Sequence, residues 1–91
     1  MYAVVTPLQF LRQARKFFKQ HPDLRPRFAK VLGDLQQDPF KPHLELHALS
    51  GKLAGCYAVS LTYRYRITLT LMVFEKEIIL LDIGSHDEGC R

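Results

Sequence analysis

Residues 65–83 read YRITLTLMVFEKEIILLDI, and this stretch decides the fold class. Apolar and more polar residues alternate through its first half, as they do in a strand that buries one face. One face would carry Ile67, Leu69, Leu71 and Val73, and the other Arg66, Thr68, Thr70 and Met72. Glu75-Lys76 predicts a tight turn after a strand over Tyr65–Phe74. Glu77–Ile83 is apolar almost throughout, which predicts a strand buried on both sides and ended by Gly84.

Two further strands are predicted outside this stretch. Tyr57–Thr62 lies close enough to residues 65–83 to complete a three-strand antiparallel meander. Tyr2–Val5 is short, apolar and β-branched, and predicts a strand at the start of the chain. Residues 39–55 contain two prolines and two glycines, so we expect this segment to be irregular.

Two helices are predicted between the first strand and residue 39. Thr6 offers an N-cap hydroxyl, and Pro7 suits the first position of a helix that runs to about Gln20. His21-Pro22-Asp23 breaks it, and a second helix ends at Asp38-Pro39. The apolar faces comprise Phe10, Leu11, Ala14, Phe17 and Phe18, then Leu24, Phe28, Val31, Leu32 and Leu35. The sequence therefore predicts an α+β fold: an N-terminal strand, an αα-hairpin and the meander, with the helices on one face of a twisted, mostly antiparallel sheet.

The size of the chain predicts a single domain over residues 1–91. Ninety-one residues suffice for one core and not for two, and the 47% hydrophobic content is ordinary for a globular protein. Cys56 and Cys90 are the only cysteines, fewer than small secreted domains usually carry, so we expect thiols in a reducing cytoplasm. We also expect no signal peptide, and no apolar stretch approaches the roughly 20 residues of a membrane span, so no membrane partner is expected.

The net charge of +4 is concentrated at the start of the chain. Residues 1–30 hold seven lysines and arginines against one acidic residue, Asp23, whereas acidic residues outnumber basic ones over residues 67–91. This distribution suggests a polyanionic or acidic partner. A helix face that is simply solvated explains the charge equally well.

Three short segments resemble the RelE/ParE toxin superfamily, and in particular its YafQ-like members. They are His47-Ala48-Leu49-Ser50-Gly51-Lys52-Leu53-Ala54-Gly55, then Tyr63-Arg64-Tyr65-Arg66-Ile67, then Leu81-Asp82-Ile83-Gly84-Ser85-His86-Asp87-Glu88. That family carries a His-x-Leu-x-Gly segment, a Tyr-Arg-Ile type strand and a Gly-(Ser/Thr)-His tail. Thr6-Pro7 with Phe10, followed by Lys19-Gln20-His21-Pro22, also resembles its first helix.

The resemblance implies the toxin of a type II toxin–antitoxin pair. Such a toxin is an endoribonuclease that cuts messenger RNA on the ribosome without metal or another cofactor, and a cognate antitoxin keeps it silent. Its partners are thus the antitoxin, the ribosome and messenger RNA. Metal-free cleavage by the ribose 2′-OH needs a base, an acid for the leaving 5′-oxygen, and positive charge beside the phosphate, roles that suit histidine and arginine.

The resemblance also implies the site residues. His86 matches the tail histidine and is the candidate for acid–base catalysis, although a solvent-exposed tail histidine is the alternative. His47 matches the loop histidine and would bind phosphate or share proton transfer, unless it only caps or packs. Arg66 matches the strand arginine that contacts the scissile phosphate, and alternation places it on the face opposite Ile67; the alternative is a solvated arginine stacked on tyrosine.

RNA binding is assigned to further basic residues, which are Lys52, Arg64, Arg12, Arg15, Lys16 and Lys19. Lys52 lies where related toxins carry a basic residue, and strand parity places Arg64 on the face of Arg66. His43 and His47 are four residues apart, as a metal pair on a helix would be, but Pro42 argues against a helix there and further ligands are lacking. No metal site is predicted.

The chain departs from the family pattern in two places. The family tail usually continues to an aromatic residue that can stack on a base, whereas here it reads Glu88-Gly89-Cys90-Arg91. YafQ-like toxins also place a second histidine where this chain has Ser60. Two other interpretations therefore stay open: a ParE-like inhibitor of DNA gyrase, which has no need of acid–base groups, and an inactive homologue that acts with an antitoxin.

Overall fold

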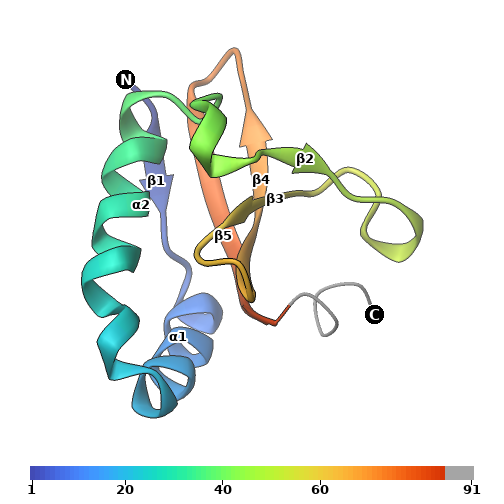
Figure 1. Ribbon diagram of the computed structural model, residues 1–91. Coiled ribbons are helices and arrows are strands. Elements are labelled where there is room, and N and C mark those ends of the chain that lie inside the picture. Colours follow the sequence, from blue (N-terminus) through green and yellow to red (C-terminus); the bar gives the residue numbers. More distant parts are fainter. Residues whose placement is uncertain (86–91) are drawn as a thin grey trace.

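The computed structural model describes residues 1–85, so the predictions for His86 and the tail fall outside it. The elements are β1 (Ala3–Val5), α1 (Leu8–Gln20), η1 (Pro22–Leu24), α2 (Arg25–Gln37), η2 (Pro42–Leu44), β2 (His47–Ala48), η3 (Gly51–Leu53), β3 (Tyr57–Ser60), β4 (Tyr65–Met72) and β5 (Glu77–Ser85). The strands form one sheet in the order β1-β5-β4-β3-β2 (Figure 1). Only the β1–β5 pair is parallel, so the predicted α+β class and mostly antiparallel sheet are confirmed.

Both predicted helices are present, but the predicted N-cap is wrong. Pro7, and not Thr6, holds the N-cap position of α1, and no side chain caps the helix. The reason is the extended conformation of Pro7, with φ −59° and ψ 156°, which delays the first turn to Leu8. The Pro7 carbonyl still accepts a hydrogen bond from Leu11 N–H at 3.0 Å. The second helix ends before Asp38, as predicted.

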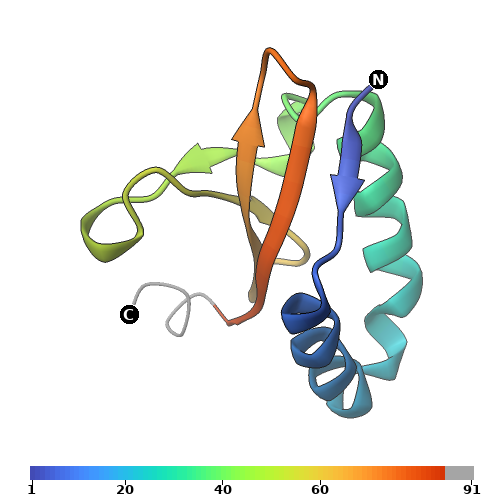
Figure 2. The same ribbon diagram turned by 180° about the vertical axis from the view of Figure 1, so that it is seen from behind.

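The helices meet at η1 and cover one face of the sheet. Phe28 of α2 packs against Phe10 and Phe18 of α1, with ring centroids 6.2 and 5.1 Å apart. α1 packs on β5, while α2 lies along β1, so that β1 is enclosed between β5 and α2 (Figures 1 and 2). Tyr2 N–H donates to the Gln36 carbonyl at 2.7 Å and ties the start of β1 to the end of α2.

Strand alternation places Ile67, Leu69 and Leu71 on the core side, as predicted, but the prediction for Val73 is wrong, because β4 ends at Met72 and Val73 is 50% exposed in the turn that follows. The side chains that join the helices in the core are Val59 and Leu61, Ile67 and Leu69, and Ile78, Leu80 and Ile83. Two predictions for β5 are wrong. It continues through Gly84, because Gly84 still pairs with Arg66 on β4. It is also not buried on both sides, since a bulge opposite Thr68/Leu69 leaves Leu81 39% exposed.

The segment expected to be irregular contains a strand. His47 and Ala48 pair with Ala58 and Tyr57 of β3 and form the fifth strand of the sheet. This strand holds the 39–55 segment against the meander and places His47 on the same side as Ser60 and Arg66 by register. Among residues 1–85, no helix is both long and apolar enough to cross a bilayer.

Candidate functional site

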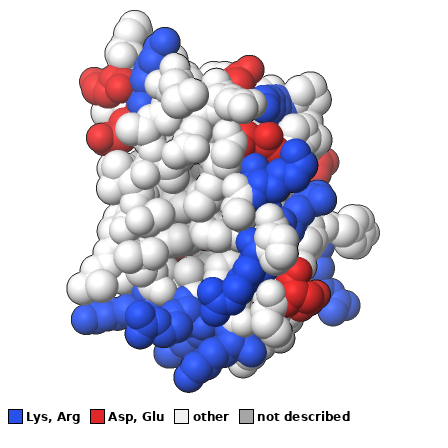
Figure 3. All heavy atoms as spheres, turned by 90° about the vertical axis from the view of Figure 1, so that its left-hand side faces the viewer, with Lys and Arg blue, Asp and Glu red and all other residues white. Residues whose placement is uncertain are grey.

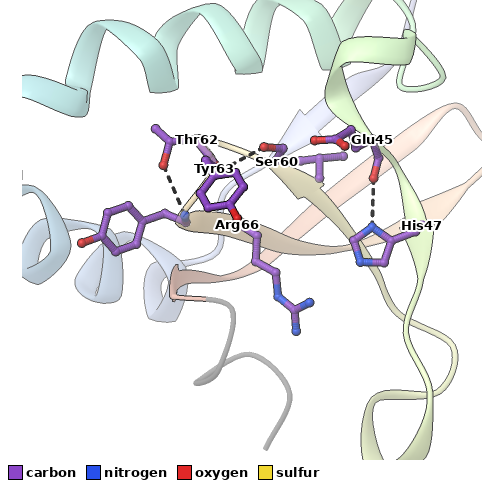
Figure 4. A pocket seen from close by; sticks show the side chains of 8 residues that line it. Glu45, His47, Ser60, Thr62, Tyr63 and Arg66 are labelled. Atoms are coloured by element: carbon purple, nitrogen blue, oxygen red, sulfur yellow. Dashed lines mark hydrogen bonds between the residues drawn. The ribbon is translucent and has the colours of Figure 1, made fainter.

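A cavity of about 260 Å³ lies at the end of the sheet where β3 turns into β4. Its lining residues are Glu45, His47, Val59, Ser60, Thr62, Tyr63, Tyr65 and Arg66. Figure 4 shows His47 and Arg66 approaching this space from opposite sides, with Tyr63 and Glu45 between them and the helices. Two of the three side chains predicted to be catalytic therefore line one cavity, although they are 19 residues apart in the sequence.

Arg66 forms part of the cavity wall. It pairs with Ser60 on one side and with Gly84 on the other, on the face opposite Ile67, as alternation predicts. The alternative of a solvated arginine is wrong, because only 4% of the residue is accessible. A guanidinium shielded from bulk water interacts more strongly with a phosphate than one on an open surface does.

His47 is exposed, and a hydrogen bond fixes its ring. Nδ1 lies 2.9 Å from the Glu45 carbonyl oxygen, which can only accept, so Nδ1 carries the proton of this bond. In the neutral ring, Nε2 is then the basic nitrogen. Glu45 itself adopts the left-handed conformation, with φ 53°, at the end of η2. The backbone at Glu45 thus orients the imidazole, and the Glu45 side chain contributes a carboxylate to the cavity rim (Figure 4).

The turn between β3 and β4 supplies the remaining polar lining. Thr62 Oγ1 accepts hydrogen bonds from the N–H groups of Arg64 and Tyr65, both at 3.2 Å, and Ser60 Oγ donates to the Thr62 carbonyl at 3.0 Å. Sequence reasoning did not assign Glu45, Thr62 or Tyr63 to the site. The signal for Tyr63 was present, since residues 63–66 read YRYR, and basic residues interleaved with aromatics are typical of nucleic-acid surfaces.

The predicted RNA-binding residues lie outside the cavity. Lys52 is exposed on η3. Gly51, which begins this element, and Gly55, which follows it, have φ of 66° and 95°, values that favour glycine. Arg64 is exposed in the turn before β4, so strand parity does not govern its direction, and its RNA-binding role stays a prediction. The four basic residues of α1 are all exposed.

Basic side chains gather at the end of the molecule where α1 meets α2 (Figure 3). This end adjoins the cavity. Tyr65 packs against Phe17 of α1 and against His21, the residue after α1, with ring centroids 5.0 and 4.7 Å apart. Arg27 Nε donates to the Leu61 carbonyl at 3.0 Å, at the start of the β3–β4 turn. Positive charge therefore extends from the helices to the mouth of the site.

A charged cluster holds η2, the segment before β2, against α2. Asp34 Oδ2 lies 2.8 Å from His43 Nε2, and Asp34 Oδ1 accepts from Lys41 Nζ at 3.2 Å. The pKa of Asp34 is lowered to about 2. The main cause is the hydrogen bond from His43, and the bond from Lys41 and the charges of Lys30 and Lys41 add to it. His43 is thus engaged with α2, while His47 bonds Glu45. Within residues 1–85, no group of three or more His, Cys, Asp or Glu side chains is arranged to hold a metal.

No protein-family model matches the sequence, and no curated protein matches it significantly. Solved structures do match. YafQ from E. coli superposes with a TM-score of 0.78 at 14% sequence identity, covering 97% of both chains. A metal-bound toxin from Helicobacter pylori gives a TM-score of 0.77 at 26% identity, covering 97% of this chain and 98% of its own. The toxin–antitoxin complex RelBE2 from Mycobacterium tuberculosis gives 0.69 at 20% identity, covering 93% and 98%.

These likenesses show the fold. The chain has the fold seen in RelE/ParE-type toxins, as its sequence motifs predicted. The superposition with YafQ covers nearly the whole length of both chains.

Proposed function

We propose that this chain is the toxin of a toxin–antitoxin pair and that it cuts messenger RNA on the ribosome without a metal ion. The observation that carries the proposal is the cavity itself. An imidazole with a fixed tautomer and a shielded guanidinium line one space large enough for a nucleotide phosphate. Proton transfer and stabilisation of phosphate charge are the two requirements of cleavage by the ribose 2′-OH.

In the proposed reaction, His47 Nε2 accepts the proton of the 2′-OH as that oxygen attacks the neighbouring phosphorus. Arg66 stabilises the negative charge that builds up on the phosphorane oxygens. The bond from phosphorus to the 5′-oxygen breaks, and this oxygen takes a proton from an acid, a role we assign to His86. The products are a 2′,3′-cyclic phosphate and a 5′-OH, and no water, metal or oxidant is consumed.

The exposed cations would guide the RNA to this cavity. Arg64 lies in the β3–β4 turn, beside the cavity-lining Tyr63, and Lys52 lies on η3, after the strand of His47. The basic face of α1 would contact ribosomal RNA, where affinity comes from phosphate neutralisation and does not depend on sequence. An antitoxin with an acidic segment would compete for the same charges.

Inducing the protein in cells and mapping messenger RNA ends tests the proposal. We expect new 5′-OH ends at ribosomal A-site positions, and we expect purified protein to cut ribosome-bound RNA equally well in EDTA. His47→Ala should lose about 10²–10⁴-fold in rate if His47 transfers the proton, while Lys76→Gln, at the far β4–β5 turn, should cut normally. Growth arrest with intact messenger RNA and altered DNA supercoiling would instead identify a gyrase inhibitor.

A further inference from the structure

Tyr63 is an exposed aromatic residue at the rim of the cavity. Its relative exposure is 103%, so it is fully accessible. The two tyrosines on the flanking strands, Tyr57 and Tyr65, pack against the core instead. Figure 4 shows the Tyr63 ring above the base of Arg66, on the cavity side of the turn. The backbone beneath it is ordered, because Thr62 Oγ1 accepts hydrogen bonds from the two N–H groups that follow Tyr63.

Tyr63 makes no side-chain hydrogen bond or aromatic contact that would stabilise residues 1–85. Among residues 1–85, its hydroxyl has no hydrogen-bond partner, and its ring is not packed against another aromatic side chain. Since a residue this exposed contributes little to stability, its replacement should change the free energy of unfolding by no more than about 0.5 kcal/mol. A large flat ring held in water beside a polar cavity matches the way proteins present aromatic side chains to unpaired bases.

We propose that Tyr63 stacks on one unpaired base of the bound strand, next to the phosphate that Arg66 and His47 contact. This inference rests on the proposed ribonuclease function. Stacking would hold one nucleotide at the rim, so that the adjoining phosphate lies in the cavity. Purines should be preferred at this position because they offer the larger ring face.

The test measures binding alone. Short single-stranded 2′-fluoro RNAs, which lack the attacking hydroxyl, are titrated at about 50 mM salt and followed by fluorescence anisotropy. Each RNA carries one abasic nucleotide at a different position. For the wild-type protein we expect one position at which removing the base weakens binding on the order of five- to a hundred-fold. Tyr63→Leu should bind every RNA at that weaker level, and Tyr63→Phe and Tyr63→Trp should keep the wild-type pattern.

The possible outcomes separate this inference from the proposed function. If Tyr63→Leu retains the wild-type preference for the intact base, Tyr63 does not stack and the inference is overturned, while cleavage dependent on His47 and Arg66 would still stand. If Tyr63→Leu impairs only capture of a protein partner, the residue belongs to a protein interface and the inference is again overturned. A wild-type protein that binds none of these RNAs also overturns the inference, whereas the proposed function is decided by the separate assay on ribosome-bound RNA.

Discussion

Arg66 is buried in the cavity wall, and this burial determines what its replacement should do. We expect Arg66→Ala to lower the free energy of unfolding by about 1–3 kcal/mol, because it removes a buried charged group from its partners. Cleavage should fall by about 10²–10³-fold. Arg66→Lys is the matched control, since lysine keeps the positive charge but cannot make a bidentate contact with phosphate. It should therefore restore the free energy of unfolding more fully than the cleavage rate. Urea denaturation and cleavage of ribosome-bound RNA measure the two effects, and an alanine variant with wild-type rate removes Arg66 from the mechanism.

Asp34 makes the attachment of η2 dependent on pH. Its folded-state pKa of about 2 lies below the ordinary value of 3.8, so its contribution to stability is fully present above about pH 4 and is lost as the pH falls towards 2. We expect the urea midpoint of the wild type to fall over this window. In Asp34→Asn the midpoint should be lower at neutral pH and should change less on acidification. Asp23→Asn, at an exposed carboxylate, is the control, and identical acid profiles for wild type and Asp34→Asn would contradict the prediction.

The sequence predicted the positions of His47 and Arg66 better than their environments. Alternation along residues 65–74 gives the face of the sheet on which Arg66 lies. It does not give how deeply Arg66 is buried, because burial depends on the segments that pack around that face. The orientation of His47 depends on the left-handed backbone at Glu45. This conformation is not predictable from the sequence, because residues other than glycine adopt it rarely. The YRYR run points to Tyr63 as a nucleic-acid contact, but it does not show that the ring lies at the rim of a cavity, because that position depends on the β3–β4 turn.

Among the elements, long periodic segments were predictable and short ones were not. α1, α2 and β4 each show several repeats of their own period, so their existence followed from the sequence. β2 has two residues, too few for any period, and it exists because β3 offers a partner. Pairing with β4 likewise extends β5 through Gly84, whereas the glycine alone predicted that the strand ends there.

The basic face of α1 should act through phosphate contacts, which makes ribosome binding sensitive to salt. We expect ribosome affinity to fall by orders of magnitude between about 50 and 200 mM salt. Lys16→Glu should weaken binding and reduce the slope of log affinity against log salt by about one. Lys76→Glu removes an equally exposed cation at the opposite end of the molecule (Figure 1) and should leave binding unchanged. Indifference to salt would show that α1 is not the docking surface.

At the scale of the whole molecule, the two edges of the sheet differ. α2 runs along the outer side of β1, whereas β2 is an edge strand of two residues. Apolar side chains are exposed on the β4–β5 hairpin, including Val73 at 50% and Phe74 at 98%. An antitoxin that adds a strand or helix would find exposed apolar surface at this hairpin, and its acidic residues would be attracted by the positive charge at the other end of the molecule, where α1 meets α2.

We therefore expect the protein to co-purify from its native operon with an acidic partner. The complex should survive mild salt, because apolar burial supplements the charge attraction. Size-exclusion chromatography of the co-expressed pair measures this. Phe74→Ser should reduce recovery of the complex without affecting RNA cleavage, since Phe74 lies in the turn remote from the cavity (Figure 1). Recovery of free monomer alone would count against a toxin–antitoxin pair.

The pairing of β1 with β5 has a consequence for the order of synthesis. Ala3 pairs with Glu77, and β5 sits between β1 and β4, so the sheet stays in two parts until residues 77–85 have been made. Contacts this far apart in sequence also form late and slowly. A nascent chain that ends before residue 77 lacks the strand that backs Arg66 and cannot complete the cavity wall. Under the proposed function, the ribosome that makes this protein would meet its activity only after translation of residues 77–85.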